Sequence, residues 1–337
     1  MLEITRTYQQ NLKAEAAACK IAVIIPCYKV KKHILGVLAA IKAPVKRIYC
    51  VDDACPEGSG KFITKHVKDQ RVKVLYNKKN LGAGGAAKTG YQAALEEGMD
   101  IIVKVDGDGQ MDPALIPQFI QPILLGHADF TKGNRFFNLE DVKEMPMMRL
   151  VGNAGLSFLT KLSSGYWHLF DPTNGYTAIH ARTLGALPLK KLSNGFSLES
   201  DLLFRLNTIG AVVQDIPMKA NYGDEQSNMK IGRSFFHFFG LNLKNFFKRI
   251  FYNYYLRDFN VASLELMIGS PLLVFGVVYG GIKWLYSIQS GIAVTPGTVM
   301  IAALPIILGA QLILAFLAYD TQSRHDRPYF IRNTKMK

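Results

Sequence analysis

Two long apolar stretches near the C-terminus constrain the fold of this chain more than any other feature. Residues 266–282 carry no charge, and residues 299–319 contain Gln311 as their only strongly polar side chain. A helix needs roughly 20 mostly apolar residues to cross a bilayer, and both stretches reach or approach that length with their flanks. Pro271 and Pro305 are tolerated in membrane helices, where neighbouring helices re-satisfy the backbone. The alternative is a helical hairpin buried in a soluble core, and the lengths favour two membrane spans.

The chain before these stretches alternates between short apolar runs and segments with a helical pattern. This alternation predicts an α/β domain with a parallel sheet and helices on both faces. Pro113 suits the first position of a helix, with Asp112 as its N-cap. Strands are expected at residues 21–26, 47–52, 72–76, 99–105, 128–132, 176–179 and 212–216, and helices at 31–40, 58–68, 84–97, 145–162 and 198–209.

An acidic turn, DGDGQMDP at residues 106–113, directly follows the apolar strand at 99–105. Two carboxylates, Asp106 and Asp108, therefore lie at the carboxyl end of a strand, where open α/β sheets bind ligands. Hard oxygen ligands at one turn suit Mg²⁺ or Mn²⁺, which complete their coordination with substrate phosphates. On these residues alone, a turn that only links a strand to a helix remains the alternative. A calcium loop of the EF-hand kind fits poorly, because Met111 and Pro117 occupy its glycine and final glutamate positions.

A glycine-rich segment, NLGAGGAAKTG at residues 80–90, partly matches two nucleotide-binding loops. Gly82, Gly84 and Ala87 satisfy GxGxxA, but residues 77–80 intervene between the strand at 72–76 and the glycine turn, and two strands precede this unit. Ala87 also replaces the second glycine that a P-loop requires. We therefore expect a glycine-rich helix start packed near a ligand rather than a phosphate loop of either type.

The charge balance points to an anionic partner. The net charge is +14, which suits nucleic acid, phosphate groups or an anionic membrane face. The basic residues are spread through the first part of the chain and concentrate beside the apolar stretches, and no nucleic-acid module is visible, so nucleic acid is not expected. Residues 1–20 lack the apolar core of a secretory signal. A reduced compartment is expected because no metal or CxxC spacing connects Cys19, Cys27, Cys50 and Cys55.

Residues 233–259 have the pattern of a helix lying in the membrane interface. One helical face carries Phe236, Phe239, Leu243, Phe246, Phe247, Ile250 and Tyr254. Away from this face lie Asn242, Lys244, Asn245, Lys248 and Arg249. A buried amphipathic helix of the soluble domain is the alternative, since periodicity alone does not separate the two.

Seven short motifs occur together in an order and spacing that are specific, although each is weak alone. The chain resembles the GT-A glycosyltransferases of family 2, and more narrowly the membrane-anchored polyprenyl-phosphate glycosyltransferases of the dolichol-phosphate mannose synthase and undecaprenyl-phosphate glucosyltransferase types. The motifs are IPCY (25–28), VDD (51–53), NLGAG (80–84), DGDGQMDP (106–113), KGNRF (132–136), DPTNGY (171–176) and YGDEQS (222–227).

This resemblance implies a domain plan. A Rossmann-like, mostly parallel GT-A catalytic domain is expected at residues 21–231, after an N-terminal extension at 1–20. Juxtamembrane amphipathic helices at 232–260 precede a transmembrane hairpin at 261–319 and a basic cytoplasmic tail at 320–337. Nothing in the sequence defines an oligomeric state, and a homo-oligomer is left open.

The resemblance also assigns site residues. Pro26, Tyr28, Val51 and Asp53 are expected to line the nucleotide pocket. Asp106 is expected to face the nucleotide side of a metal site that Asp108 and Gln110 hold. Arg135 and Arg149 match arginines that bind phosphate, where a bidentate guanidinium fits a pair of oxygens. Asp171 and Glu199 are the candidates for a base or an orienting group, with Asp201 a weaker alternative to Glu199.

The sequence departs from the family pattern in two places. Lys29 and Val30 replace an Asn-Glu pair, which puts a ribose contact in doubt, and Gly175-Tyr176-Thr177 replaces Gly-Phe-Arg. The QxxRW motif of processive synthases is absent from the sequence.

The reaction expected from the resemblance is an inverting, Mg²⁺- or Mn²⁺-dependent transfer of a sugar from a nucleotide-sugar to a polyprenyl monophosphate. A UDP-sugar is favoured over GDP-mannose as the donor. Two alternatives remain: transfer to a hydroxyl of a lipid-linked glycan, and a non-enzymatic nucleotide- or membrane-binding protein that keeps the fold.

The charges around the spans predict their orientation. Residues 287–297 between the spans carry no charge, whereas basic residues flank the hairpin on both outer sides. The positive-inside rule therefore places the catalytic domain and both termini in the cytoplasm, at the inner membrane of a bacterium or the ER of a eukaryote. The flanking cations are Lys244, Lys248, Arg249 and Arg257 before the first span, and Arg324, Arg327, Arg332, Lys335 and Lys337 after the second.

Overall fold

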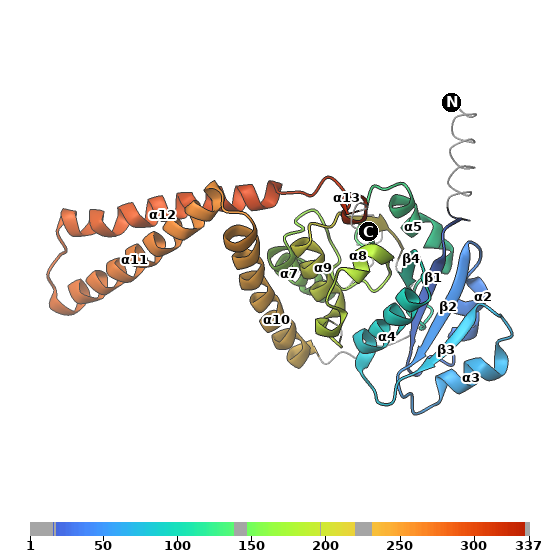
Figure 1. The fold of residues 1–337 in the computed structure, drawn as a ribbon. Coiled ribbons are helices and arrows are strands. Elements are labelled where there is room, and N and C mark those ends of the chain that lie inside the picture. The colour runs from blue at the N-terminus through green and yellow to red at the C-terminus, as the bar shows by residue number, and fades with distance from the viewer. Residues whose placement is uncertain (1–15, 17, 138–146, 196, 220–230, 334–337) are drawn as a thin grey trace. The chain divides into compact units, whose positions relative to one another are not determined.

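The chain divides into two compact units that are connected through one long helix and through the C-terminal segment. The computed structural model describes residues 16, 18–137, 147–195, 197–219 and 231–333. One unit, here the sheet unit, comprises Met1–Phe246 and His325–Lys337, and the other, the hairpin unit, comprises Phe247–Arg324 (Figure 1). The motif at 222–227 lies outside the described residues.

The sheet unit is built on a seven-stranded sheet with the order β3-β2-β1-β4-β6-β5-β7. All neighbouring strands are parallel except β6, which runs antiparallel to both β4 and β5. The predicted mostly parallel sheet is therefore confirmed. The antiparallel direction of β6 was not predicted, because an apolar run indicates a strand but not its direction. The strands are β1 (Ile21–Cys27), β2 (Val45–Asp52), β3 (Val72–Tyr76), β4 (Ile101–Lys104), β5 (Phe130–Asn134), β6 (Thr177–His180) and β7 (Val213–Pro217).

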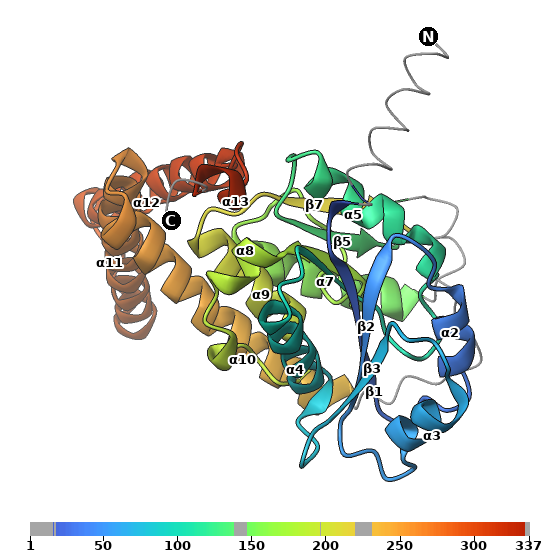
Figure 2. The same cartoon turned by 45° about the vertical axis from the view of Figure 1, so that its right-hand side comes forward.

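Helices cover both faces of this sheet, as predicted. Side chains of β1 alternate between two cores: Val23 and Ile25 pack with α2 and α5, whereas Ala22 and Ile24 pack with α4 and α9. Burial on both faces explains why β1 reads as a continuous apolar run. Figure 2 shows β1 to β3 between α4 on one side and α2 and α3 on the other. The helices are α2 (Ile34–Ala40), α3 (Ser59–His66), α4 (Gly82–Glu96), α5 (Ile116–Leu124), α7 (Met147–Ser164), α8 (Ala181–Gly185) and α9 (Leu198–Thr208).

The acidic turn leaves the carboxyl end of β4, in the centre of the sheet, as predicted. It ends in a short 3₁₀ helix, η1 (Pro113–Leu115), which leads into α5. Asp112 accepts a hydrogen bond from the amide of Ala114 at 2.9 Å, so it caps this helix with Pro113 in the first position. Local capping chemistry therefore fixes where the turn stops and the helix starts.

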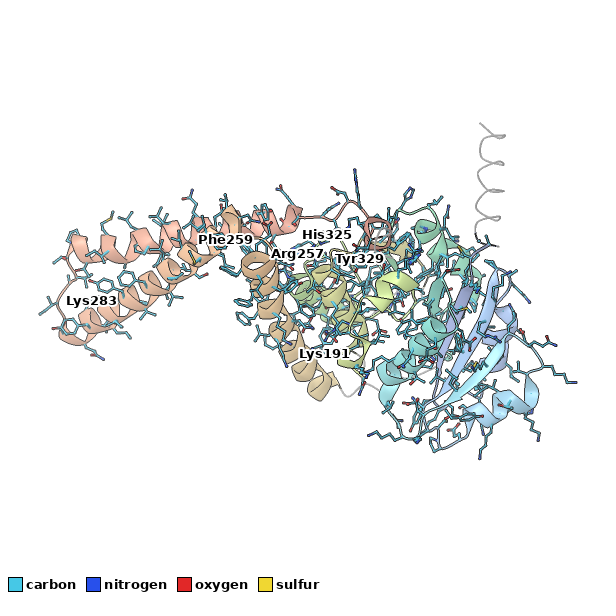
Figure 3. All side chains as sticks on the ribbon, viewed as in Figure 1. Lys191, Arg257, Phe259, Lys283, His325 and Tyr329 are labelled. Carbon is cyan, nitrogen blue, oxygen red and sulfur yellow. The ribbon has the colours of Figure 1, made fainter. Side chains whose placement is uncertain are left out.

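The C-terminal segment returns to the sheet unit, which the sequence did not predict. Helix α13 (Tyr329–Arg332) begins where Asp129 accepts hydrogen bonds from the amides of Tyr329 (2.7 Å) and Phe330 (3.0 Å). The ring of Phe330 stacks on His180 with centroids 4.0 Å apart. Figure 3 labels Tyr329 at this helix. Asp129 is fully buried and also accepts from Thr183 and from the amide of Val212, so its carboxylate is well compensated.

The hairpin unit contains two helices long and apolar enough to cross a membrane, α11 (Val261–Ser290) and α12 (Pro296–Gln322). Only 22% and 11% of their most apolar windows are buried, whereas the core helix of a soluble protein would be mostly buried. The buried-hairpin alternative therefore does not fit. Glu265 and Lys283 lie about 27 Å apart along α11 at ~1.5 Å per residue, close to the thickness of a hydrocarbon core. Figure 3 shows Lys283 and Phe259 towards opposite ends of this helix.

Helix α10 (Ile231–Phe251) and the π-helical turn η3 (Tyr252–Arg257) lead into α11. The aromatic face is exposed as expected for Phe239, Leu243 and Phe247, which are 41%, 45% and 63% accessible. Lys244 and Lys248 are exposed too.

The expected outward position of the other polar side chains of α10 is wrong. Asn242, Asn245 and Arg249 are at most 3% exposed, and Ile250 and Tyr254 are buried as well. Ser163 donates to Asn242 at 2.5 Å, and Asn245 donates to Asp201. These polar side chains are therefore buried and hydrogen-bonded to neighbouring segments. Their polarity alone predicts a face exposed to solvent.

Candidate active site

A buried lysine organises the carboxylates at the end of β4. Lys104 is the last residue of β4, and its Nζ lies 2.9 Å from Asp106 Oδ1 and 3.2 Å from Glu199 Oε1. A third hydrogen bond goes to the carbonyl oxygen of Gly175 at 3.2 Å. An ammonium has three donors, so this side chain is saturated. The arrangement brings together two predicted site residues, Asp106 and Glu199, from segments far apart in the sequence.

Electrostatics in this cluster follow from burial and from the neighbouring charges. Burial alone would lower the pKa of Lys104, but Asp106 and Glu199 outweigh it and hold the pKa above its ordinary value. Burial raises the pKa of Glu199, and Lys104 offsets part of that rise. Lys104 therefore stays protonated and allows two carboxylates to share one site.

Asp108 lies two residues after Asp106 in the same acidic turn and is half-buried. Its Oδ1 accepts the amide hydrogen of Gln110 at 3.0 Å, which folds the turn so that both side chains start from one short loop. Carboxylate and amide oxygens form a donor set suited to Mg²⁺ or Mn²⁺. Among the described residues, no group of three or more His, Cys, Asp or Glu could hold a metal by itself.

Asp53 lies beneath the N-terminus of α4. Its carboxylate accepts hydrogen bonds from the Asn77 side chain and from the amides of Leu81 and Gly82, all between 2.7 and 3.0 Å. It is 2% exposed. Geometry thus favours a role in shaping the loop, and the direct nucleotide contact expected for Asp53 stays a prediction.

The glycine-rich start of α4 packs against protein backbone. A Cβ on Gly82 or Gly84 would lie 2.7 to 2.8 Å from the carbonyl oxygens of Ser193 and Asn194, and the amide of Gly85 donates to Asn194. Small residues are required here by the loop before α9. This agrees with the expectation that the segment is neither a dinucleotide loop nor a P-loop.

The other residues expected to contact the nucleotide lie at or just after the carboxyl ends of β1 and β2. Pro26 pairs with Val51 across these strands, so both lie near their carboxyl ends. Pro26 is partly exposed, Tyr28 is 44% exposed and Val51 is fully buried. The side chains of Pro26 and Tyr28 are therefore accessible here, whereas the side chain of Val51 is not.

Arg135 is held by Asp171 in a two-pronged ion pair. Arg135 donates from Nε to Oδ2 and from Nη2 to Oδ1, both at 2.7 Å, and its amide donates to Oδ2 at 3.1 Å. Asn174 adds a further hydrogen bond at 3.0 Å. Burial would raise the pKa of Asp171, but Arg135 outweighs it and holds that pKa below its ordinary value. Of the two roles considered for Asp171, this geometry favours orienting over accepting a proton.

The loop at residues 171–176 joins the two clusters, since Asn174 contacts Asp171 and Gly175 contacts Lys104. Arg149 lies in α7, and its side chain is outside what the structure describes. Sequence reasoning missed Lys104, which reads as one residue of an apolar strand. A lysine inside a buried strand and two residues before an acidic pair was the only available signal.

A second buried lysine supports this region. Lys132 is 1% exposed and lies 3.0 Å from Asp215, with a further hydrogen bond to the carbonyl of Phe170. Asp215 also accepts from Asn134 and from the amide of Phe170. These contacts fix the segment before Asp171 onto β5 and β7, and so help to position the Arg135 pair.

Comparison with known proteins shows which family this chain belongs to. The chain matches glycosyl transferase family 2 over residues 22–186. It is 30% identical to the UDP-N-acetylglucosamine–dolichyl-phosphate N-acetylglucosaminyltransferase of Methanococcus voltae, over 64% of this chain and 93% of the relative. It is 29% identical to the undecaprenyl-phosphate mannosyltransferase of Micrococcus luteus, over 59% of this chain and 82% of the relative.

Among solved structures, glucosyl-3-phosphoglycerate synthase from Mycobacterium tuberculosis in complex with UDP is similar in fold. The TM-score is 0.53 at 18% identity, with 71% of this chain and 82% of that chain covered. The sheet and its covering helices therefore have the GT-A fold. The chain belongs to glycosyl transferase family 2.

Proposed function

We propose that this enzyme transfers a sugar from a nucleotide-sugar to a polyprenyl monophosphate with inversion at the anomeric carbon. The observation that carries the proposal is the position of Asp106 and Asp108 at the carboxyl end of β4, beside Glu199, in a chain that also carries two apolar helices of membrane-spanning length. The names of the relatives from Methanococcus voltae and Micrococcus luteus support a polyprenyl-phosphate acceptor. We favour a UDP-sugar as the donor.

The residues at the acidic turn suit a divalent cation. Asp108 and Gln110 would hold Mg²⁺ or Mn²⁺, and Asp106 would face the nucleotide beside it. A bound cation would supply positive charge for the leaving diphosphate. Arg135, fixed by Asp171, presents a guanidinium that suits phosphate oxygens of the donor or the acceptor.

The acceptor phosphate is already ionised near neutral pH, so proton removal contributes little to the reaction. Positioning of the two substrates then supplies much of the rate. Glu199 is the candidate for a group that contacts the acceptor or the sugar.

The acceptor requires a membrane surface, because a polyprenyl tail stays in the bilayer and its phosphate lies at headgroup depth. The exposed face of α10 offers Phe239, Leu243 and Phe247 beside Lys244 and Lys248. Apolar side chains next to cations favour an interface rich in anionic lipid. We place the sheet unit and both termini on the cytoplasmic side, from the charges that flank the spans.

A product assay tests the proposal. Purified enzyme in nanodiscs is incubated with a panel of UDP- and GDP-sugars, undecaprenyl or dolichyl phosphate, and Mg²⁺ or Mn²⁺. We expect an acid-labile polyprenyl-phosphate sugar from one donor, with inverted anomeric configuration by NMR and no product in EDTA. Sugar that appears only in longer lipid-linked oligosaccharides would instead support the hydroxyl-acceptor alternative and overturn this proposal.

A further inference from the structure

A buried lysine, Lys104, connects three segments of the sheet unit. Its side chain is 4% exposed, and its three donors reach an aspartate of the acidic turn, a glutamate of α9 and a carbonyl of the loop at 171–176. Three segments that carry expected site residues therefore meet at one nitrogen atom. Removing the ammonium would leave two partly buried carboxylates close together and uncompensated.

At Gly175, in the loop at 171–176, a side chain would come very close to this lysine. A Cβ on Gly175 would lie 2.6 Å from Lys104 Nζ and 2.7 Å from Asp106 Oδ2. Its φ is not among the positive values of this chain, so backbone strain does not require glycine here. An added Cβ would therefore disturb the ion pair rather than the backbone.

We propose that Lys104 is a positioning residue that fixes the carboxylates of Asp106 and Glu199 relative to each other for the transfer reaction, and that Gly175 leaves the space in which it does so. The proposal rests on the proposed function. It adds that the acidic turn and Glu199 act as one unit, because a single cation sets the place of both.

Gly175→Ala tests this without removing any charge or hydrogen-bonding group. The added methyl displaces the ion pair, and a misplacement of about 1 Å can lower a rate ~100-fold. The matched control is Gly185→Ala on α8, where a Cβ would meet nothing within 4 Å. We expect kcat to fall roughly 100-fold in Gly175→Ala and to stay within about twofold of wild type in Gly185→Ala.

A double-mutant cycle tests the coupling. Lys104→Met and Glu199→Gln are measured singly and together, with kcat and both KM values and with denaturant unfolding of each variant. If Lys104 acts through Glu199, kcat of the double variant is no more than about threefold below kcat of the less active single variant. Two results would overturn the proposal. One is a loss of kcat in the double variant that equals the product of the losses in the two single variants, and the other is a Gly175→Ala variant with wild-type kcat.

Nucleotide binding separates this inference from the proposed function. Titration of UDP with Mn²⁺ should show an affinity about tenfold weaker in Gly175→Ala than in Gly185→Ala, since Asp106 is displaced. A wild-type protein that binds UDP but forms no lipid-linked sugar would overturn the proposed function alone. Equal affinities for the two alanine variants would overturn the role of Lys104 whatever the acceptor is.

Discussion

Arg249 of α10 and Asp320 of α12 form a buried two-pronged ion pair within the hairpin unit. Arg249 donates from Nη1 to Oδ1 at 2.5 Å and from Nη2 to Oδ2 at 3.0 Å, and both side chains are at most 3% exposed. The hydroxyl of Tyr254 donates to the same carboxylate at 2.6 Å. The end of α10 and the end of α12 are thereby fixed to each other.

Breaking this pair should destabilise the hairpin unit strongly. In Arg249→Met the buried carboxylate of Asp320 loses its cation, which typically costs ~3–5 kcal/mol. Denaturant unfolding in mild detergent measures the change. Lys248→Met, one residue away and exposed, is the control and should stay within about 0.5 kcal/mol of wild type. Equal stability of the two variants would mean that Arg249 contributes nothing as an ion-pair partner.

Asp108→Asn should abolish sugar transfer and leave the fold intact, because a half-buried carboxylate in a turn contributes little to packing. Asp106→Asn should weaken nucleotide binding as well. Transfer rates with Mg²⁺ and Mn²⁺, UDP titrations and unfolding curves of both variants provide the measurements. Asp108→Asn enzyme that works at the wild-type rate would show that the metal assignment is wrong.

The pair between Arg135 and Asp171 predicts how stability changes in acid. The pKa of Asp171 lies below its ordinary value in the folded protein, so the pair contributes stability fully above the unfolded pKa of ~3.9. That contribution is lost as the pH falls below this value and through the folded pKa. Asp171→Asn should therefore lower Tm near pH 7 and flatten the Tm profile below about pH 4.

The same variant separates two roles for Asp171. An orienting role predicts that Asp171→Asn raises KM for a phosphate-bearing substrate more than it changes the pH dependence of kcat. Arg135→Lys should show a similar rise, since an ammonium cannot make the two-pronged contact. A different result would assign a proton-accepting role to Asp171. In that case Asp171→Asn would lower kcat, leave KM unchanged and remove one ionisation from the pH profile of kcat.

The exposed aromatic face of α10 should bind the lipid surface. Replacing Phe239, Phe246 and Phe247 with Ser should raise the apparent KM for polyprenyl phosphate and leave KM for the nucleotide-sugar nearly unchanged. Phe246 is only half-exposed, so Phe239→Ser with Phe247→Ser is the cleaner pair. Leu35→Ser, an exposed apolar residue of α2, serves as the control. An unchanged acceptor KM in nanodiscs would indicate that α10 does not touch the membrane.

The orientation of the hairpin is testable with reporters. A reporter fused after Lys337 should be cytoplasmic, and one inserted between Ser290 and Pro296 should lie on the opposite side. The reason is the uncharged connection between the spans, compared with the basic residues outside them. A C-terminal reporter on the external side would contradict the assignment.

Local chemistry explains which parts of the fold were predictable. The strand β1, the acidic turn and the cap at Asp112 depend on residues close in sequence, so apolar runs and turn residues are sufficient to find them. The direction of β6 depends on pairing with β4 and β5, which no local pattern encodes.

Long-range contacts explain what was missed at the site. Lys104 pairs with Glu199, a residue far away in sequence that reaches it through the packing of α9 on the sheet. Asn242 and Arg249 look like surface residues until their partners Ser163 and Asp320 are known. Polar residues inside an amphipathic helix are therefore ambiguous in sequence, because a buried hydrogen-bonded seam and a wet face have the same composition.

The buried carboxylate of Asp129 connects the stability of the sheet unit to the order in which the chain is synthesised. Two of its hydrogen-bond donors, the amides of Tyr329 and Phe330, lie 200 and 201 residues later in the chain. They leave the ribosome only after both apolar helices have been made. Until then the sheet unit has a buried charge with half of its partners missing, which is costly. Completion of the sheet unit is thus tied to completion of the hairpin unit, because a chain that stops before α13 leaves Asp129 without two of the four hydrogen-bond donors described here.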